Sequence, residues 1–288
     1  MSTDSQNAEN SVADTVADTV ADTVADTAAD ALRPAAPLSE QLVLVTGGAR
    51  GLGAAITRAF LREGASVVIN YRSSREAAEA LAAEHPGRAL AVAADVRDAA
   101  QVRTLVDAAR EHFGRPITTV VNNALVDFAF TGDARSTAGE ITAAELSTQF
   151  SGSVQAPLQV IQAALPGMRE AGVGRIISVG TNLFQHPVVP YHDYTAAKAA
   201  LLSLTRTFAE DLGPEGITVN MISGGLLRST DASAATPTEV FDAIAASTPL
   251  RRVTTPEELA DAAVFFASPW ARGVTAQNLI VDGGLVKG

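Results

Sequence analysis

Residues 42–60 read LVLVTGGARGLGAAITRAF, and this stretch decides the fold. A short Leu/Val run leads directly into a glycine-rich loop, and a helical pattern of small and apolar residues begins at once after it. Gly47, Gly51 and Gly53 suit a tight turn, a close approach of the backbone to a pyrophosphate, and a helix packed near the strand. The helix would direct free N–H groups and a partial positive charge at the phosphates. We therefore predict a phosphate-binding loop, with a purely structural turn as the alternative.

The rest of the chain alternates short apolar runs with longer amphipathic stretches. The predicted strands are 42–46, 66–70, 89–93, 118–122, 175–179, 217–221 and 278–281. The predicted helices include 52–63, 74–84, 98–113, 142–169, 194–212 and 257–267. Near-continuous apolar strands between helices indicate a parallel sheet that is covered on both faces. We therefore predict an α/β fold of the Rossmann type: one doubly wound domain over residues 41–288, with a seven-stranded parallel sheet and helices on both faces.

The first 40 residues differ from the rest in composition. Residues 12–27 repeat the unit VADT four times, and residues 1–40 carry eight acidic side chains and one arginine. A four-residue repeat drifts around a helix, and Asp and Thr are poor helix formers. We expect a disordered or partly helical acidic extension, which is either a solvated tail or an amphipathic helix that binds a partner.

Composition excludes several classes of protein. The 288-residue chain is 47% hydrophobic and has no cysteine, which rules out disulfides and thiolate metal sites. No apolar run reaches the roughly 18 residues of a membrane-spanning helix, and no signal peptide is recognisable. Of the net charge of −11, −7 falls on residues 1–40, and no basic cluster indicates a nucleic-acid face. We expect a cytoplasmic enzyme that binds neither nucleic acid nor membrane.

The end of the second predicted strand bears on the choice of cofactor. An NAD enzyme usually has an acid here that accepts hydrogen bonds from the ribose 2′-OH, but residues 70–74 read NYRSS. Arg72, together with Arg50 from the glycine loop, suits the 2′-phosphate of NADP(H). Asp95 follows the third strand and is either an acceptor for the adenine amino group or a helix cap. We predict NADP(H) as the favoured cofactor, with NAD(H) as the alternative.

Tyr194 and Lys198 stand four residues apart on a predicted helix, so their side chains share one face. A tyrosine has a pKa of about 10 in water, and a nearby ammonium lowers that pKa by favouring the phenolate. The pair can then donate a proton to a carbonyl oxygen, or take one from an alcohol, near neutral pH. We expect Lys198 to lower the pKa of Tyr194 in this way.

Taken together, the motifs resemble the classical short-chain dehydrogenase/reductase superfamily, and within it the 3-oxoacyl-[acyl-carrier-protein] reductase-like members. The resemblance runs from about residue 40 to the end of the chain, with the motifs in the family's order. Besides the glycine loop and the Tyr/Lys pair, residues 122–124 read NNA where the family has N-N-A-G. Thr181 stands at the position of the family's catalytic serine, and residues 282–284 match the C-terminal D-G-G.

The resemblance implies a role for each of these residues. Tyr194 would be the general acid/base, Lys198 would hold the nicotinamide ribose and lower the tyrosine pKa, and Thr181 would orient the substrate carbonyl. The family's catalytic asparagine aligns best with Ser153, which completes the predicted catalytic set. The predicted cofactor contacts are Thr46, Gly47, Arg50, Gly51, Leu52, Gly53, Tyr71, Arg72, Ser73, Asp95, Val96, Asn122, Asn123, Ala124, Tyr194, Lys198 and Gly225. Members of the family are usually homotetramers, so we expect a homotetramer or a homodimer.

Three positions depart from the family pattern. Leu125 replaces the glycine of N-N-A-G, and Ser153 replaces an asparagine that helps to hold a water in a proton relay. Gly224 replaces the proline before Gly225, at the start of a substrate loop expected at about 225–247. We interpret the three changes as altered substrate fit, with partial loss of activity as the alternative.

Several histidines and aromatic side chains are further candidates for site residues. Four scattered histidines without cysteine do not form a ligand set, so we predict no metal site. His192 is a candidate substrate contact. Phe128, Phe130 and Phe184 either line an apolar pocket or belong to the core, and Trp270 is best explained by packing or by a subunit contact.

The predicted function is that of an NADP(H)-dependent oxidoreductase. It would interconvert a small-molecule ketone, for example a 3-oxoacyl thioester, and a secondary alcohol by hydride transfer. We favour the direction of reduction, because the cellular NADP(H) pool is usually kept reduced. The alternatives are an NAD-dependent alcohol dehydrogenase of the same family and a low-activity dinucleotide-binding sensor or scaffold.

Overall fold

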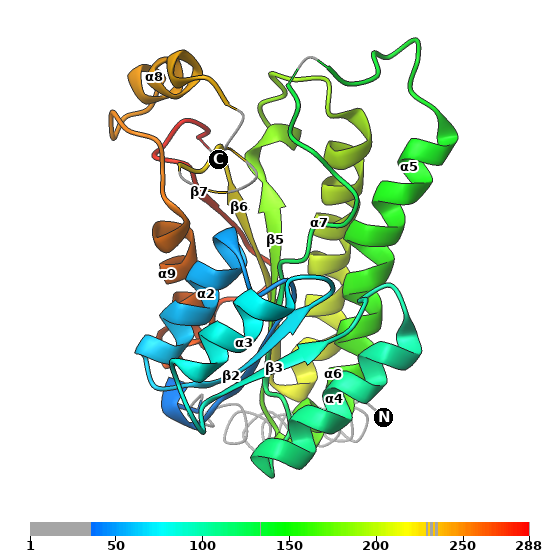
Figure 1. Ribbon diagram of the computed structural model, residues 1–288, viewed down its shortest axis with the longest axis vertical. Coiled ribbons are helices and arrows are strands. Elements are labelled where there is room, and N and C mark those ends of the chain that lie inside the picture. Colours follow the sequence, from blue (N-terminus) through cyan, green and yellow to red (C-terminus); the bar gives the residue numbers. More distant parts are fainter. Residues whose placement is uncertain (1–35, 133, 229, 231–232, 234–235, 288) are drawn as a thin grey trace, which may run out of the picture. The chain divides into compact units, whose positions relative to one another are not determined.

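The computed structural model describes residues 36–132, 134–228, 230, 233 and 236–287 (Figure 1). The acidic repeat at 12–27 lies outside these residues. The folded unit begins at Ala36, and a short 3-10 helix, η1 (Leu38–Glu40), precedes the first strand. The described structure therefore starts slightly before residue 41, where the sequence places the start of the domain.

A seven-stranded parallel sheet forms the centre of the unit. Its strands are β1 (Leu42–Val45), β2 (Ser66–Tyr71), β3 (Ala89–Ala93), β4 (Thr119–Asn122), β5 (Gly174–Thr181), β6 (Ile217–Gly224) and β7 (Asn278–Val281). The strand order is β3-β2-β1-β4-β5-β6-β7, and every neighbouring pair is parallel. The predicted doubly wound sheet is confirmed. Ligands bind to such sheets at the carboxyl ends of the strands, next to the point between β1 and β4 where the order reverses.

Helices cover both faces of this sheet (Figure 1). The α-helices are α2 (Gly51–Arg62), α3 (Arg75–Ala83), α4 (Ala99–Phe113), α5 (Ala143–Phe150), α6 (Ala156–Ala171), α7 (His192–Leu212), α8 (Thr238–Ser247) and α9 (Pro256–Ala267). Three further 3-10 turns are η3 (Asn182–Phe184), η4 (Gly213–Glu215) and η6 (Pro269–Ala271). None of the helices in the described part of the chain combines the length and the hydropathy that crossing a membrane requires.

Two apolar cores lie between the sheet and its helices, one on each face. Helices α2, α3 and α9 supply the first core, in which Phe60 and Phe266 are fully buried. Helices α4, α6 and α7 supply the second, with Leu105 and Val160 in its interior. Because both faces are covered, the strands are apolar along nearly their whole length, which is the pattern that the sequence shows.

The predicted continuous helix over 142–169 is wrong at one point. A π-helical segment, η2 (Ser151–Gln155), separates α5 from α6. Apolar periodicity does not reveal such a local widening of the helix, so the sequence carries no signal for it. Short π-helical segments occur frequently at functional sites, and this one contains Ser153.

Candidate active site

The glycine loop connects the end of β1 to the start of α2, as predicted. A Cβ at Gly53 would lie 2.1 Å from the carbonyl oxygen of Gly47, so no side chain fits there. Gly47 and Gly51 have φ values of +62° and +49°, in the left-handed region that favours glycine. Arg50 at the N-cap of α2 supplies no side-chain cap, so the first N–H groups of α2 suit an anionic phosphate.

Thr46 ties the glycine loop to the end of β4. Its Oγ1 accepts hydrogen bonds from the backbone N–H groups of Asn123 (2.9 Å) and Ala124 (3.0 Å). The Asn123 Nδ2 donates back to the carbonyl oxygen of Thr46 at 2.9 Å. These three predicted cofactor contacts therefore join the two strand ends at the reversal of strand order.

Asn122 ends β4, and its side chain, unlike those of Thr46 and Asn123, is unsatisfied within the described residues. Its side-chain oxygen and nitrogen are buried and have no hydrogen-bond partner among the described residues. A buried amide normally finds a partner, so this one fits a site that a bound molecule completes. Together with the glycine loop, the Asn122 side chain makes the carboxyl ends of β1 and β4 a good fit for a dinucleotide.

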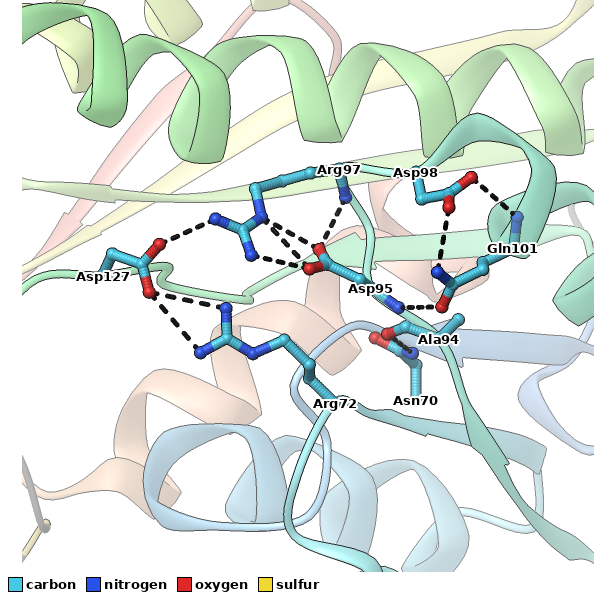
Figure 2. A network of polar contacts seen from close by, with 8 residues as sticks. All are labelled: Asn70, Arg72, Ala94, Asp95, Arg97, Asp98, Gln101 and Asp127. Atoms are coloured by element: carbon cyan, nitrogen blue, oxygen red, sulfur yellow. Dashed lines mark hydrogen bonds and ion pairs between the residues drawn. The ribbon is translucent and has the colours of Figure 1, made fainter.

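Arg72 follows β2 and takes part in a network of charged side chains (Figure 2). Its Nη1 and Nη2 donate to Asp127 Oδ1 at 3.4 Å and 3.5 Å. The other carboxylate oxygen of Asp127 accepts from Arg97 Nη1 at 2.7 Å. Asp127 therefore bridges two guanidinium groups, one of which is the predicted 2′-phosphate ligand. The sequence did not single out Asp127 or Arg97, because loop residues far apart in the chain carry no local signal of pairing.

Asp95 does not cap α4, so one of its two predicted roles is wrong. The cap is Asp98, whose Oδ1 accepts from the N–H groups of Ala100 (2.8 Å) and Gln101 (3.2 Å). The Asp95 carboxylate instead accepts from Arg97 Nη2 at 2.6 Å (Figure 2). The hydrogen bond from Arg97 lowers the pKa of Asp95, which keeps this carboxylate ionised as an acceptor.

The remaining predicted cofactor contacts divide between core and loop. Tyr71 and Val96 are buried in the two cores, and Leu52 packs against one of them, so these side chains primarily serve packing. Ser73 lies in the loop after β2. Gly225 follows β6, and a Cβ there would come within 3.0 Å of the Asn182 Nδ2.

The structure brings Thr181, Tyr194 and Lys198 together. Thr181 ends β5, and the other two lie one turn apart on α7. All three are buried, with relative exposures of 4%, 6% and 4%. Lys198 Nζ donates to the carbonyl oxygen of Val179 at 2.7 Å and lies 5.8 Å from the centroid of the Tyr194 ring. The predicted acid/base pair and its hydroxyl partner thus share one site.

The pKa of Tyr194 departs from the expectation. Burial raises it to about 12, and a hydrogen bond with Thr181 offsets only part of that effect. Burial also lowers the pKa of Lys198 to about 8. The expected net lowering of the tyrosine pKa is therefore wrong for this structure, because the loss of water around the phenol has the largest effect. Tyr194 is protonated at neutral pH, which suits a proton donor.

Ser153 lies in η2, which packs against α7. Its side chain is 2% exposed, and its Oγ has no hydrogen-bond partner among the described residues. A buried hydroxyl in this state can hold a water or a ligand atom. Leu125 and Gly224 are the other two positions that differ from the family pattern. Leu125 is 38% exposed in the loop after β4, and Gly224 ends β6.

Aromatic side chains surround the catalytic tyrosine. Phe128, Phe130 and Tyr191 all contact the Tyr194 ring or one another. The sequence left the first two open between pocket and core, and the structure places them at the site. Phe184 is the last residue of η3 and follows Thr181 by three positions in the chain.

Comparisons with known proteins agree with this geometry. The family model described as enoyl-(acyl carrier protein) reductase matches residues 47–286. An uncharacterized oxidoreductase of Methylorubrum extorquens is 34% identical over 254 residues, which cover 86% of this chain and 98% of that protein.

Solved structures give the same result. A blue fluorescent protein from a metagenomic library, in complex with NADPH, superimposes with a TM-score of 0.77 at 36% identity, covering 88% of this chain and all of that one. A short-chain dehydrogenase of Burkholderia cenocepacia, in complex with NADP, gives a TM-score of 0.76 at 35% identity, covering 87% of this chain and 99% of that one. From its fold, its motifs and these relatives, the chain belongs to the short-chain dehydrogenase/reductase superfamily of oxidoreductases.

Proposed function

We propose that the protein is an NADP(H)-dependent ketone reductase, with Tyr194 as the proton donor. One observation carries the proposal: Tyr194 is buried, contacts the Thr181 hydroxyl, and has Lys198 one turn away on α7. A phenol and a hydroxyl next to each other can hydrogen-bond a single carbonyl oxygen. Burial of the phenol excludes the water that would otherwise compete for that oxygen.

The chain's own residues account for the proton side of the reaction. Thr181 Oγ1 positions the carbonyl oxygen, and Tyr194 Oη donates its proton to that oxygen as negative charge develops there. Lys198, held by the carbonyl of Val179, is placed to bind the hydroxyls of a nicotinamide ribose and to stabilise the resulting phenolate. The bound nicotinamide supplies the hydride.

The preference for NADP(H) rests on the residues after β2. Arg72 stands where an NAD enzyme usually has an acid. Asp127 accepts hydrogen bonds from both Arg72 and Arg97 and so links the two guanidinium groups. Two guanidinium groups suit a 2′-phosphate dianion. The NADPH and NADP complexes of two similar structures support the same cofactor for this chain. We propose the direction of reduction, because the cellular NADP(H) pool is usually kept reduced.

The test is NADPH consumption with a panel of ketones that includes 3-oxoacyl thioesters. Tyr194→Phe keeps the ring and its packing but removes the acidic hydroxyl, so we expect kcat to fall by about 100-fold or more while NADPH binding is retained. Faster turnover with NADH would favour the NAD-dependent alternative. Tight NADPH binding without consumption of any ketone would contradict the reductase and favour a dinucleotide-binding sensor.

A further inference from the structure

Three aromatic rings gather at the proton donor. The Phe128 ring stacks on the Tyr194 ring, with centroids 4.7 Å apart and planes at 26°. Phe130 meets Tyr194 edge-on at 5.6 Å, and Tyr191 meets Phe128 edge-on at 5.3 Å. Phe128 and Phe130 come from the segment after β4, whereas both tyrosines belong to the start of α7 or precede it directly. We call Phe128, Phe130 and Tyr191 the aromatic wall.

A partly buried ion pair between Arg135 and Asp193 lies against this wall. The Arg135 guanidinium carbon lies 4.5 Å from the centroid of the Phe128 ring, and Arg135 Nη2 donates to Asp193 Oδ2 at 2.5 Å. The two side chains are only 20% and 5% exposed. A second tie joins the loop to Tyr191, whose Oη accepts from the N–H of Gly132 at 2.7 Å. Burying an ion pair contributes little net stability. We therefore attribute to this pair the role of holding the Phe128 ring in position.

The wall has the chemistry of a site for aromatic rings. Phe128 and Phe130 are only partly buried, so the fold does not cover these residues completely. Aromatic rings prefer offset-stacked or edge-to-face contacts, and each such pair contributes about two- to tenfold in affinity beyond simple burial. A saturated ring of equal size buries a similar area but has no π-face. A wall that is held rigid loses little entropy when it binds a flat ligand.

We propose that the aromatic wall is a substrate subsite and that the substrate is a ketone bearing a planar aromatic ring within one or two bonds of its carbonyl carbon. This inference rests on the proposed ketone reductase. The ring lies against Phe128 and Phe130, and the carbonyl oxygen takes the proton of Tyr194 Oη. The carbonyl carbon accepts a hydride from NADPH, which is oxidised to NADP⁺, and the ketone becomes a secondary alcohol. Solvent returns a proton to the phenolate.

Phenylacetone and cyclohexylacetone form a matched pair of substrates for the test. Their carbon skeletons are the same, and in neither is the carbonyl conjugated with the ring. We expect kcat/KM of the protein to favour phenylacetone by about tenfold, as two ring pairs would give. Phe128→Leu and Phe130→Leu keep an apolar side chain but remove the π-face, so each should lower this ratio severalfold, mainly through KM. Phe265→Leu, at a 38% exposed position on α9, should leave the ratio unchanged.

The ratio of kcat/KM for phenylacetone to kcat/KM for cyclohexylacetone is insensitive to a general loss of activity, because a misplaced Tyr194 would slow the reduction of both ketones alike. A ratio near one in the unsubstituted protein, or a ratio that neither leucine substitution moves, would overturn the subsite and leave the reductase standing. Binding of the two product alcohols, measured by saturation-transfer NMR with NADP⁺ present, separates the two proposals. Preferred binding of the phenyl alcohol without turnover of either ketone would retain the subsite and overturn the reductase. Neither binding nor turnover would overturn both.

Discussion

Folding removes Tyr194 and Lys198 from water, and their pKa values move in opposite directions as a result. The phenol is harder to ionise and the amine is easier to deprotonate, because both shifts disfavour the charged form. Lys198 keeps a hydrogen bond to Val179 O, and Tyr194 keeps its contact with Thr181. A buried lysine with a strongly shifted pKa is the kind of group that is found at functional sites.

Lys198 should make stability depend on pH. Its folded pKa of about 8 lies below its ordinary value of 10.5, so between these values the unfolded chain binds more protons than the folded one. The free energy of unfolding should therefore rise with pH over this window, by up to about 3 kcal/mol. Lys198→Met should abolish the rise, and urea unfolding between pH 8 and 10 measures it. Above pH 10, Tyr194 acts with the opposite sign, because its pKa is raised to about 12.

Lys287→Met is the matched control, because Lys287 is exposed near the C-terminus. It should leave the pH profile of the unfolding free energy as it is in the unsubstituted protein. Parallel profiles for all three proteins would contradict the assignment to Lys198.

Arg72 should set the choice between NADPH and NADH. Arg72→Ala removes charge-assisted hydrogen bonds to the 2′-phosphate, so KM for NADPH should rise by about 10- to 100-fold while KM for NADH changes little. Arg75→Ala serves as the control, because Arg75 is exposed on α3 and pairs with Glu79. Steady-state kinetics with both cofactors gives the answer. Equal effects of Arg72→Ala on the two cofactors would exclude a role in binding the phosphate.

Asp127 refines this prediction, because its carboxylate lies 3.4 Å from the Arg72 guanidinium and would repel a phosphate (Figure 2). Asp127→Asn should lower KM for NADPH severalfold at low salt, and added salt should shrink the effect. A rise in KM for NADPH would instead mean that Asp127 holds Arg72 in its binding position.

Among the elements, the π-helical segment η2 separates α5 from α6 and buries Ser153 beside α7. Ser153→Ala removes a hydroxyl that has no hydrogen-bond partner among the described residues, so the free energy of unfolding should change by less than about 1 kcal/mol. If the hydroxyl holds a water of a proton relay, kcat should still fall by about tenfold. Ketone reduction and urea unfolding of the same samples separate the two effects.

Ser147→Ala is the control for that experiment, because Ser147 is exposed on the preceding helix, α5. It should change neither quantity. Unchanged kcat in Ser153→Ala would remove Ser153 from the predicted catalytic set.

The sequence predicted elements well wherever burial imposes a pattern. All seven strands were predicted, because each is a short apolar run in a sheet with helices on both faces. Helix α8 (Thr238–Ser247) was missed and assigned to a substrate loop, because it buries no residue and so carries no core-facing stripe. The glycine loop and the Tyr194/Lys198 pair were predictable because each is local in the chain. The stacking of Phe128 on Tyr194 and the pairing of Arg135 with Asp193 join distant segments, so only the fold reveals them.

At the scale of the whole molecule, the sheet ends at β7, whose outer edge has no partner strand among the described residues. The elements around it expose large apolar side chains: Trp270 in η6 is 82% exposed, Leu279 in β7 39%, and Phe265 in α9 38%. Exposed apolar residues at a sheet edge favour association with another chain. We therefore expect this edge to form a subunit contact in a homotetramer, as the family resemblance implies.

Trp270→Ser combined with Leu279→Ser should break that contact. Burial of two large side chains contributes about 2–6 kcal/mol to an interface, which is enough to shift a tetramer toward dimers at micromolar concentration. Light scattering coupled to size exclusion measures the mass directly. Val240→Ser, at a 42% exposed position on α8, is the control and should leave the mass unchanged. A tetramer that survives the double substitution would place the subunit contact elsewhere, for example on the long helices α6 and α7, whereas a monomeric unsubstituted protein would remove the tetramer altogether.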